Sequence, residues 1–294
     1  MRVLLVGHRG QLGTELLRQL ESGCSETGVV PQCYKGAEIT CADLGELDIT
    51  DRQAVLSYVG ECKPDVIINC AAYTNVDGCE THRDEAYRVN ATGPRNLAMA
   101  AERAGAKLLH VSTDYVFDGT QAEPRREYDL PNPVSVYGKT KLAGEEFARR
   151  FCSRAFIVRT AWLYGYEGKN FVKTMLRLGR EKGIVTVVND QIGNPTNAVD
   201  LAYHILKIAA TEEYGTYHCT GNGACSWYDF ACKIMEYAGI EARVVPCSSE
   251  EYPSPTKRPA YSALDHMMLR LTVGDDMRDW REALACYFEH YTEE

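Results

Sequence analysis

A short apolar run that leads directly into a glycine-rich turn constrains the fold of this chain most. Residues 2–6 are Arg-Val-Leu-Leu-Val, and Gly7, Gly10 and Gly13 follow with the spacing G-x-x-G-x-x-G. Glycines here permit a tight turn and let backbone amides approach a pyrophosphate, which the N-terminus of the next helix attracts. An ordinary βα turn can carry the same glycines, but the position directly after an apolar strand favours dinucleotide binding.

The rest of the chain alternates short apolar runs with longer amphipathic segments, which is the pattern of βα units around a parallel sheet. The expected strands, of which the first four are rich in Val, Ile and Leu, are residues 2–6, 65–69, 107–112, 155–159, 184–188, 216–219 and 243–246. The expected helices are residues 12–20, 84–104, 137–150, 200–210, 227–238 and 277–291. The sequence therefore predicts an α/β fold, with a Rossmann-type doubly wound parallel sheet and a smaller C-terminal substrate-binding lobe.

The same pattern suggests how the chain divides. Residues 1–165 are expected to form mainly the dinucleotide-binding domain, to which residues 191–217 return, and residues 166–190 and 218–294 mainly the substrate-binding lobe. The irregular stretch 23–40 is interpreted as an insertion before the second strand. Proline and glycine cluster at residues 119–133 and 246–259, and long loops in compact domains often have a function.

Composition argues against several classes of protein. The net charge of −9 argues against general nucleic-acid binding, although backbone amides and a few arginines can still hold a phosphate. No apolar run reaches the roughly 18 residues of a membrane span, and the N-terminus lacks the pattern of a signal peptide. We therefore expect a cytoplasmic protein with no nucleic-acid or membrane partner.

The 12 cysteines extend from Cys24 to Cys286 without a C-x-x-C pair. Since no secretory signal is evident, we expect them to be reduced and mostly to act as small buried hydrophobic side chains. Their spacing does not match that of zinc ligands, so no metal site is predicted.

An acidic residue that follows the expected second strand is a candidate for binding a ribose. Asp43, in Thr-Cys-Ala-Asp-Leu, could accept a hydrogen bond from a 2′-hydroxyl and repel a 2′-phosphate, which favours NADH over NADPH. More residues separate Asp43 from Gly13 than is usual in this fold, and the insertion at residues 23–40 would account for the extra length. Asp48 and Ile49 could lie against the adenine, unless Asp48 only caps a helix that begins near Thr50.

Small residues follow the strand predicted at residues 65–69. They would let a cofactor pass close over the carboxyl end of that strand. The candidate contacts in this segment are Ala71, Ala72, Tyr73 and Thr74.

Hydroxyl and ammonium groups farther along the chain indicate a reaction centre. Tyr137 and Lys141 share a face of the predicted helix, and a cation there would lower the pKa of the phenol and make it a better proton donor. Thr113 or Ser112 ends a buried strand, where a hydroxyl can polarise a carbonyl group. A Y-x-x-x-K spacing alone often occurs by chance, so the prediction rests on its combination with the strand-end hydroxyl and the glycine turn.

Three motifs together resemble those of the extended short-chain dehydrogenase/reductases, and within them the dTDP-4-dehydrorhamnose reductases. The motifs are the glycine turn at residues 7–13, Ser-Thr-Asp-Tyr-Val-Phe-Asp-Gly at residues 112–119 and Tyr-Gly-Lys-Thr-Lys-Leu-Ala-Gly-Glu at residues 137–145. The resemblance continues through residues 159–165, 170–175, 189–196 and 257–259, and so spans nearly the whole chain.

The resemblance implies reduction of the C4 keto group of dTDP-4-dehydro-L-rhamnose, with hydride from NADH or NADPH. Tyr137 would donate the proton to the C4 oxygen, Thr113 would bind that oxygen, and Lys141 would lower the Tyr137 pKa and hold the nicotinamide ribose. The implied contacts with the sugar are Thr113, Asp114, Tyr137 and Trp162, and Arg258 would contact the nucleotide. The implied cofactor contacts are Gly10, Gln11, Leu12, Asp43, Asp48, Ile49, Ala71, Ala72, Thr74, Tyr137 and Lys141.

Some of these residues have plainer alternatives, and other functions stay open. Trp162 could be a packing residue and Arg258 a solvated surface arginine. A dehydratase of this fold would carry a second carboxylate after Asp114, where this chain has Tyr115. An epimerase would retain its nicotinamide, and the regulatory subunit of methionine adenosyltransferase resembles the reductase without serving mainly as an enzyme.

Oligomeric state stays open as well. Some members of the family are described as Mg²⁺-linked homodimers with glutamate ligands, and Glu15 matches one such position. A full set of ligands cannot be matched, so the sequence is compatible with a monomer or a homodimer.

Overall fold

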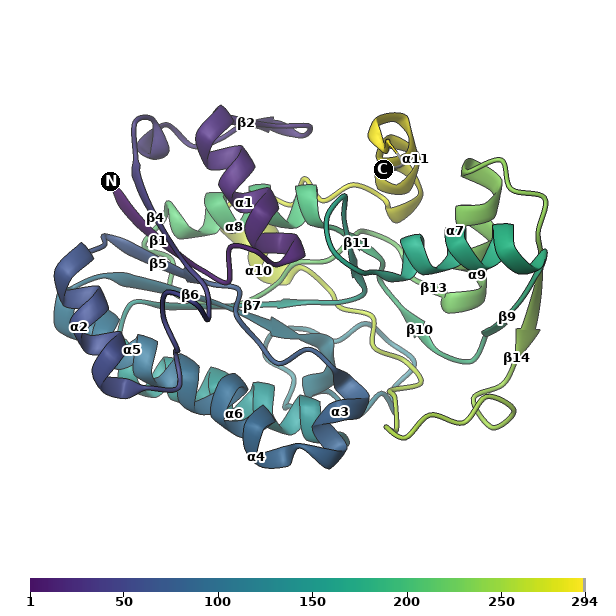
Figure 1. Ribbon diagram of the computed structural model, residues 1–294, viewed down its shortest axis with the longest axis horizontal. Helices are drawn as coiled ribbons and strands as arrows, with labels where there is room; N and C mark the ends of the chain where they lie inside the picture. The colour runs from purple at the N-terminus through teal and green to yellow at the C-terminus, as the bar shows by residue number, and fades with distance from the viewer. Residues whose placement is uncertain (293–294) are drawn as a thin grey trace.

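A six-stranded parallel sheet forms the centre of the computed structural model, which describes residues 1–292 (Figure 1). Every neighbouring pair of its strands is parallel. In spatial order the strands are β12 (Gly215–His218), β7 (Ala155–Thr160), β6 (Lys107–Thr113), β5 (Val66–Asn69), β1 (Arg2–Val6) and β4 (Glu38–Ala42). Parallel strands are covered on both faces, which explains why β5 and β7 are buried along their whole length.

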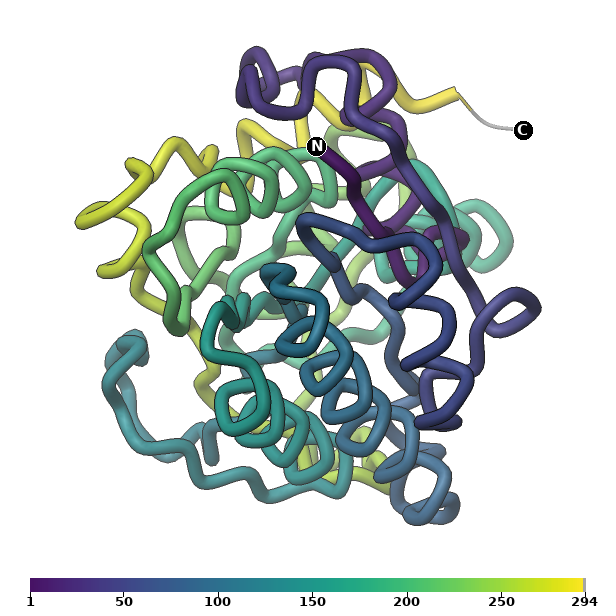
Figure 2. The backbone as a smooth tube through the Cα atoms, turned by 90° about the vertical axis from the view of Figure 1, so that its left-hand side faces the viewer, coloured from purple at the N-terminus to yellow at the C-terminus, as the bar shows by residue number. Residues whose placement is uncertain are grey.

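Helices cover both faces of this sheet, as Figure 1 shows. On one face lie α1 (Gln11–Ser22) and α8 (Ala198–Ala209), and on the other α2 (Arg52–Cys62), α5 (Gly93–Ala104) and α6 (Val136–Phe151). Side chains alternate along a strand, so Leu5 joins the apolar cluster under α1 and α8, whereas Leu4 joins the cluster on the opposite face. Figure 2 shows α5 and α6 running side by side on that second face.

The order of the strands places the topological switch point of the sheet between β1 and β5. The chain passes from β1 to β4 on one side and then returns to β5 on the other side of β1. In doubly wound sheets ligands bind at such a switch point, outside the carboxyl ends of the strands. Gly7 follows β1 with φ of +78°, and a Cβ atom on it would lie 2.6 Å from the backbone nitrogen of Ala71, which follows β5.

A second lobe with its own apolar core lies beside the sheet. It contains α7 (Phe171–Lys182), α9 (Trp227–Tyr237) and α11 (Trp280–His290), with β9 (Ile184–Val188) paired in parallel to β14 (Arg243–Cys247). The remaining short elements are β2 (Cys24–Ser25), β3 (Gly28–Val29), η1 (Gln32–Tyr34), α3 (Val76–Thr81), α4 (Arg83–Tyr87), η2 (Arg88–Thr92), η3 (Asp114–Val116), β8 (Leu163–Tyr164), β10 (Ile192–Gly193), β11 (Thr196–Asn197), β13 (Cys225–Ser226) and α10 (Met267–Leu271).

The α/β fold predicted from the sequence is confirmed, and several elements differ in detail. The helix predicted over residues 84–104 is interrupted by the π-helical turn η2, and α7 was not predicted. The stretch interpreted as an irregular insertion contains the hairpin of β2 and β3, and β4 begins at Glu38, so the last residues of that stretch belong to the second strand. Within residues 1–292, every helix is too short or too polar to cross a bilayer.

Candidate active site

The glycine turn connects β1 to α1 closely. Gly7 donates its N–H to the carbonyl of Ala42 at 2.8 Å, and Gly10 is the residue at which α1 is capped. A side chain on Gly13 would overlap the carbonyl oxygen of Gly7, so the third glycine is required for close packing of helix and turn. Leu12 is buried and Gln11 is half-buried at the first turn of α1.

Asp43 directly follows β4, at the edge of the glycine turn. Its carboxylate accepts hydrogen bonds from the backbone N–H of Arg9 at 3.2 Å and of Leu44 at 2.8 Å. The Arg9 guanidinium, largely exposed, forms an ion pair with Glu46. A carboxylate and a guanidinium therefore both stand at the position where a ribose 2′ group is recognised in this fold. Sequence reasoning overlooked Arg9, although a basic residue between the first two glycines was a usable signal.

Asp48 and Ile49 are placed differently from the prediction. Asp48 accepts the N–H of Thr50 at 2.8 Å in a turn, and the residue that caps α2 is Asp51. The side chain of Ile49 is in the hydrophobic core, where Gly93 leaves room for it. Ile49 can therefore offer its backbone to an adenine but not an exposed side chain.

The segment after β5 is held in place by a buried asparagine that the sequence did not reveal. Asn90, in the π-helical turn, accepts the N–H of Tyr73 at 2.8 Å and donates to the Tyr73 carbonyl at 3.1 Å and to Thr140 at 3.2 Å. Ala71, Ala72 and Tyr73 are half-buried and Thr74 is exposed. Short π-helical turns are frequent at functional sites, and this one ties the loop after β5 to α6.

Thr113, Asp114 and Tyr137 form one corner at the carboxyl end of β6. The Thr113 hydroxyl donates to Oδ1 of Asp114 at 2.9 Å and is also within hydrogen-bond reach of the Tyr137 phenol. The Ser112 hydroxyl instead donates to Glu145 at 2.6 Å in the interior. Of the two hydroxyls considered for polarising a carbonyl, Thr113 is therefore the one beside Tyr137.

Two residues position Tyr137 at the start of α6. Ser135 caps the helix and accepts the N–H of Gly138 at 3.1 Å. A side chain on Gly138 would overlap the carbonyl oxygen of Tyr115, so glycine lets the first turn approach the end of β6. The rings of Tyr115 and Tyr137 then meet edge to face, with centroids 5.6 Å apart.

Lys141 is nearly fully buried and donates from Nζ to the carbonyl of Val111 at 2.7 Å. Burial lowers its pKa to about 8, against the opposing effect of the Glu145 charge. Burial and the Asp114 charge raise the pKa of Tyr137, although its bond with Thr113 lowers it. The predicted lowering of the Tyr137 pKa by Lys141 is therefore not the dominant effect in this structure, because the ammonium is held at the strand carbonyl and burial outweighs it.

Asp114 combines burial with a free acceptor. Its carboxyl is 2% exposed, and burial raises its pKa to about 6 while the hydroxyls of Ser262 and Thr113 oppose that rise. Its Oδ2 atom has no hydrogen-bond partner. An unpaired buried acceptor costs free energy, which a hydroxyl group of a ligand would recover.

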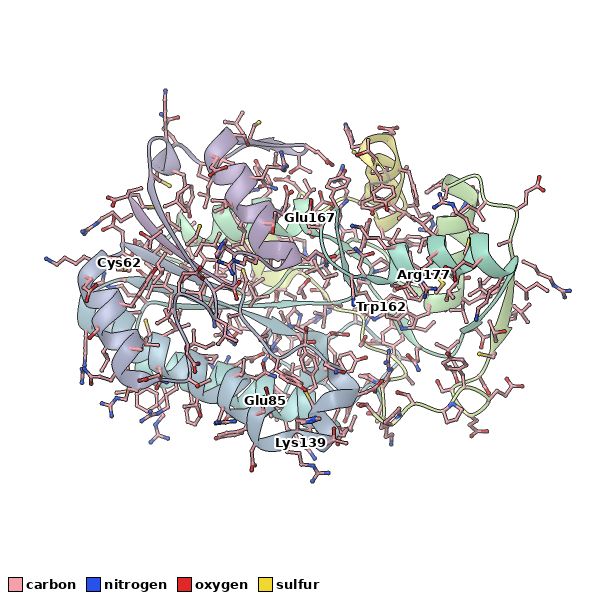
Figure 3. The ribbon with its side chains drawn as sticks, viewed as in Figure 1. Cys62, Glu85, Lys139, Trp162, Glu167 and Arg177 are labelled. Atoms are coloured by element: carbon pink, nitrogen blue, oxygen red, sulfur yellow. The ribbon has the colours of Figure 1, made fainter. Side chains whose placement is uncertain are left out.

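Trp162 lies between the sheet and the second lobe (Figure 3). Its indole stacks on Trp227 of α9 with ring centroids 3.5 Å apart, and it packs against Gly193, whose missing side chain leaves space for the ring. Its φ of +45° is unusual for a residue other than glycine, and such strain often occurs at functional sites. The alternative that Trp162 is a packing residue is therefore met in part. The indole packs against its neighbours, and the residue remains partly exposed.

Arg258 lies in the loop between β14 and α10, beside α3. Its guanidinium is about one third exposed and lies 3.8 Å from a carboxylate oxygen of Asp77 in α3. Its Nε is buried without a hydrogen-bond partner, so one donor is free. It is therefore not simply a solvated surface arginine.

A buried ion pair supports the helix that carries Tyr137 and Lys141. Glu145 accepts hydrogen bonds from Arg159 of β7 at 2.7 and 2.9 Å, and Arg159 also contacts the ring nitrogen of His218 at 3.3 Å. These charges are almost completely shielded from solvent. No local sequence pattern predicts this network, because its members come from separate elements.

Glu15, the position matched to a Mg²⁺ ligand, is engaged within its own helix. Its carboxylate accepts hydrogen bonds from Arg18 at 2.6 and 2.9 Å and from Gln19 at 2.7 Å. In the described part of the chain, the one group of three side chains close enough to hold a metal ion is Glu26, Cys286 and His290, which does not include Glu15.

Comparisons with known proteins agree with this geometry. The family described as the RmlD substrate binding domain matches residues 1–293. Over 288 residues the chain is 41% identical to the spore coat polysaccharide biosynthesis protein SpsK of Bacillus subtilis, with 98% of this chain and 97% of that protein covered.

Solved structures are similar over almost the whole chain. A dTDP-4-dehydrorhamnose reductase from Clostridium acetobutylicum has a TM-score of 0.93 and 49% identity, covering 98% of this chain and 99% of that one. The dTDP-4-dehydrorhamnose reductase from Bacillus anthracis, in complex with NADP, has a TM-score of 0.91 and 45% identity, covering 98% of each chain. With the glycine turn and the Thr113, Tyr137 and Lys141 set in place, this chain belongs to the dTDP-4-dehydrorhamnose reductase family.

Proposed function

We propose that this protein reduces the C4 keto group of dTDP-4-dehydro-L-rhamnose to give dTDP-L-rhamnose, with NADH or NADPH as the reductant. One observation carries the proposal: the Thr113 hydroxyl donates to Asp114 at the carboxyl end of β6, and Tyr137 lies close enough to both for them to shift its pKa, with Lys141 on the same helix as Tyr137. The names of its relatives support the same reaction.

The residues around the switch point fit a dinucleotide. Gly7 and Gly13 let the turn approach the backbone of Ala71 and the start of α1 closely, and α1 begins at this turn with its N-terminus. Gly10, Gln11 and Leu12 would hold the pyrophosphate, and Ala71 to Thr74 would line the path over β5. When bound, the nicotinamide supplies the hydride.

Tyr137 is the proton donor in this proposal. Its raised pKa keeps the phenol protonated at neutral pH, so the proton is present to be given to the C4 oxygen as negative charge develops there. Thr113 would turn its single hydroxyl hydrogen from Asp114 to the same oxygen, and it transfers no proton. Lys141 would bind the nicotinamide ribose and offset the phenolate that remains after transfer.

The sugar and nucleotide would be held by the second lobe and the loops near it. Asp114 offers a free carboxylate oxygen to a sugar hydroxyl. Trp162 offers its partly exposed side chain to the sugar, and Arg258 offers its partly exposed guanidinium to the nucleotide phosphates. Substrate binding would thus involve both the second lobe, proposed to consist mainly of residues 166–190 and 218–294, and residues from the carboxyl edge of the sheet.

Cofactor preference would be set by Asp43 and Arg9 together. Asp43 alone favours NADH, because a carboxylate binds a ribose hydroxyl and repels a phosphate. Arg9 is largely exposed and close to Asp43, so its guanidinium can turn from Glu46 to a 2′-phosphate. We therefore propose that the protein accepts NADPH as well as NADH.

The reaction can be tested directly with the purified protein. We expect oxidation of NADH or NADPH with dTDP-4-dehydro-L-rhamnose, and a single product identified as dTDP-L-rhamnose by chromatography and NMR. A panel of other dTDP-4-keto sugars measures selectivity. Tightly bound NAD⁺ without net cofactor oxidation would instead indicate an epimerase, and absence of turnover together with a co-purifying protein would indicate a regulatory subunit.

A further inference from the structure

Glu26, Cys286 and His290 form a cluster that the proposed reaction does not use. Glu26 lies between β2 and β3, at the turn of the hairpin, and the other two residues lie on α11. One ligand atom from each residue lies within 4.8 Å of the other two. Figures 1 and 2 both show the hairpin and the C-terminal part of the chain on the same side of the molecule.

The two residues on α11 are already spaced for a shared ligand. Cys286 and His290 are four residues apart and therefore occupy one face of the helix. The Cys286 sulfur lies 3.7 Å from Nδ1 of His290 and 3.2 Å from Oε2 of Glu26. Ligands around a tetrahedral zinc ion lie roughly 3.4–3.6 Å apart, as the usual zinc bond lengths dictate. The cluster is thus close to the required size without any movement of the backbone.

The carboxylate of Glu26 is oriented toward the thiol by its neighbours. Tyr166 donates its hydroxyl to Oε1 of Glu26 at 2.8 Å, and Arg278 donates to Oε2 at 3.1 Å. Arg278 is itself paired with the buried carboxylate of Asp200 at 2.7 Å, so its charge is already balanced. Such outer hydrogen bonds hold ligating side chains in many metal sites.

His290 supplies the nitrogen ligand through Nδ1. This atom lies 3.7 Å from the Cys286 sulfur and 3.0 Å from the carbonyl oxygen of Cys286. A metal-bound Nδ1 carries no proton and cannot donate to that carbonyl, so metal binding replaces this contact.

We propose that Glu26, Cys286 and His290 bind one Zn²⁺ ion, with water as the fourth ligand, and that the ion fastens the β2–β3 hairpin to α11. A thiolate, an imidazole and a carboxylate together suit zinc, whereas Mg²⁺ and Ca²⁺ require oxygen ligands. On binding, a zinc–sulfur bond replaces the S–H bond of Cys286, and the proton passes to solvent. Nothing in the proposal depends on the reductase activity.

The test uses the full chain after treatment with a chelator. Zn²⁺ affinity is measured by competition with a chromophoric chelator, and Co²⁺ is added as a spectroscopic probe. We expect one ion per chain, a thiolate-to-cobalt charge-transfer band, and visible bands of tetrahedral intensity. Cys286→Ser should abolish the charge-transfer band, while Cys33→Ser, at an exposed cysteine outside the cluster, should retain it.

A second variant protects the test against a folding defect in Cys286→Ser. His290 is exposed, so His290→Ala should fold normally. Loss of a residue that only hydrogen-bonds to a metal ligand lowers metal affinity by about 10- to 100-fold, so loss of the ligand His290 itself should lower the Zn²⁺ affinity at least that much. Zn²⁺ should raise the thermal midpoint of the wild type and not that of this variant. Equal Zn²⁺ affinity in wild type and His290→Ala, or a charge-transfer band that persists in Cys286→Ser, would overturn the proposal.

Discussion

Two buried ionisable residues define the protonation state in which the site can work. Burial raises the pKa of Asp114 to about 6 and lowers that of Lys141 to about 8. Between these values Asp114 is an anion that can accept a sugar hydroxyl, and Lys141 is a cation that can offset a phenolate. Below a pH of about 6 Asp114 is protonated and no longer an anionic acceptor, and above a pH of about 8 Lys141 loses its positive charge.

We therefore expect kcat/KM to form a bell across pH, falling below about 6 and above about 8. Asp114→Asn, which cannot be protonated, should lower kcat/KM and remove the acidic limb while keeping the alkaline one. Asp129→Asn, at a half-buried loop carboxylate that accepts the N–H of Arg126, is the matched control and should keep both limbs. Steady-state kinetics across this range decide the matter, and an unchanged acidic limb in Asp114→Asn would exclude Asp114 as its source.

Cofactor selectivity is a second property of single residues. Arg9→Gln should lower kcat/KM for NADPH by about 10- to 100-fold, the worth of a hydrogen bond to a charged group, and should leave NADH nearly unaffected. Asp43→Asn should shift the ratio in the opposite direction, because it no longer repels a 2′-phosphate. Arg103→Gln, an exposed arginine of α5, serves as the control. Equal losses of kcat/KM with NADH and NADPH in Arg9→Gln would contradict the assignment of Arg9 to the 2′-phosphate.

At the scale of elements, the attachment of α6 to the sheet decides where Tyr137 and Lys141 stand. Glu145 of α6 binds Ser112 of β6 and Arg159 of β7 in the interior. The pKa of Glu145 is lowered in spite of its burial, because the Arg159 charge and hydrogen bonds stabilise the anion. A helix held through its middle by two strands keeps its first turn fixed at the carboxyl edge.

Removing one partner of the Glu145 and Arg159 ion pair should lower the free energy of unfolding considerably. Glu145→Gln leaves the Arg159 guanidinium buried without a balancing charge, so we expect a loss of about 3–5 kcal/mol in the free energy of unfolding. Arg149→Ala removes the partly exposed arginine that also contacts Glu145, and should cost less than about 1 kcal/mol. Urea denaturation of both variants measures the difference, and equal stabilities would show that the buried pair does not support α6.

Elements with a clear apolar period could be predicted from the sequence, and contacts between distant elements could not. The bounds of β1 and β9 agree with the prediction, because both are runs dominated by branched apolar side chains. The π-helical turn within the predicted helix 84–104 depends on the bonds of Asn90 to Tyr73 and Thr140. No local pattern encodes those partners.

The candidate site shows the same limit. The glycine turn and the Tyr137 and Lys141 pair are local motifs that their spacing shows, whereas Thr113 was joined to them as the catalytic hydroxyl by the family resemblance. The burial of Ile49 depends on Gly93, and the position of the Lys141 ammonium depends on the Val111 carbonyl, which are both tertiary contacts. For this reason the direction of the Tyr137 pKa could not be obtained from the i, i+4 spacing alone.

At the scale of the whole molecule, the proposed reaction centre lies near the contact between the sheet and the second lobe. Gln11, at the first turn of α1, accepts a hydrogen bond from Asn170, the residue that caps α7, at 2.9 Å. Trp162 joins the end of β7 to α9 by stacking on Trp227. The cofactor turn and the lobe proposed to hold the substrate are thus connected directly, and Tyr137 stands at the sheet's carboxyl edge beside them.

The proton transfer assigned to Tyr137 is the central claim, and Tyr137→Phe tests it most directly. This variant removes one hydroxyl and keeps the ring, so folding and NADH binding should stay close to those of the wild type. Turnover of dTDP-4-dehydro-L-rhamnose should fall by about 100-fold or more, the scale of general acid catalysis. Tyr128→Phe, at an exposed tyrosine, should keep full activity. Turnover in Tyr137→Phe equal to that of the wild type would contradict the account.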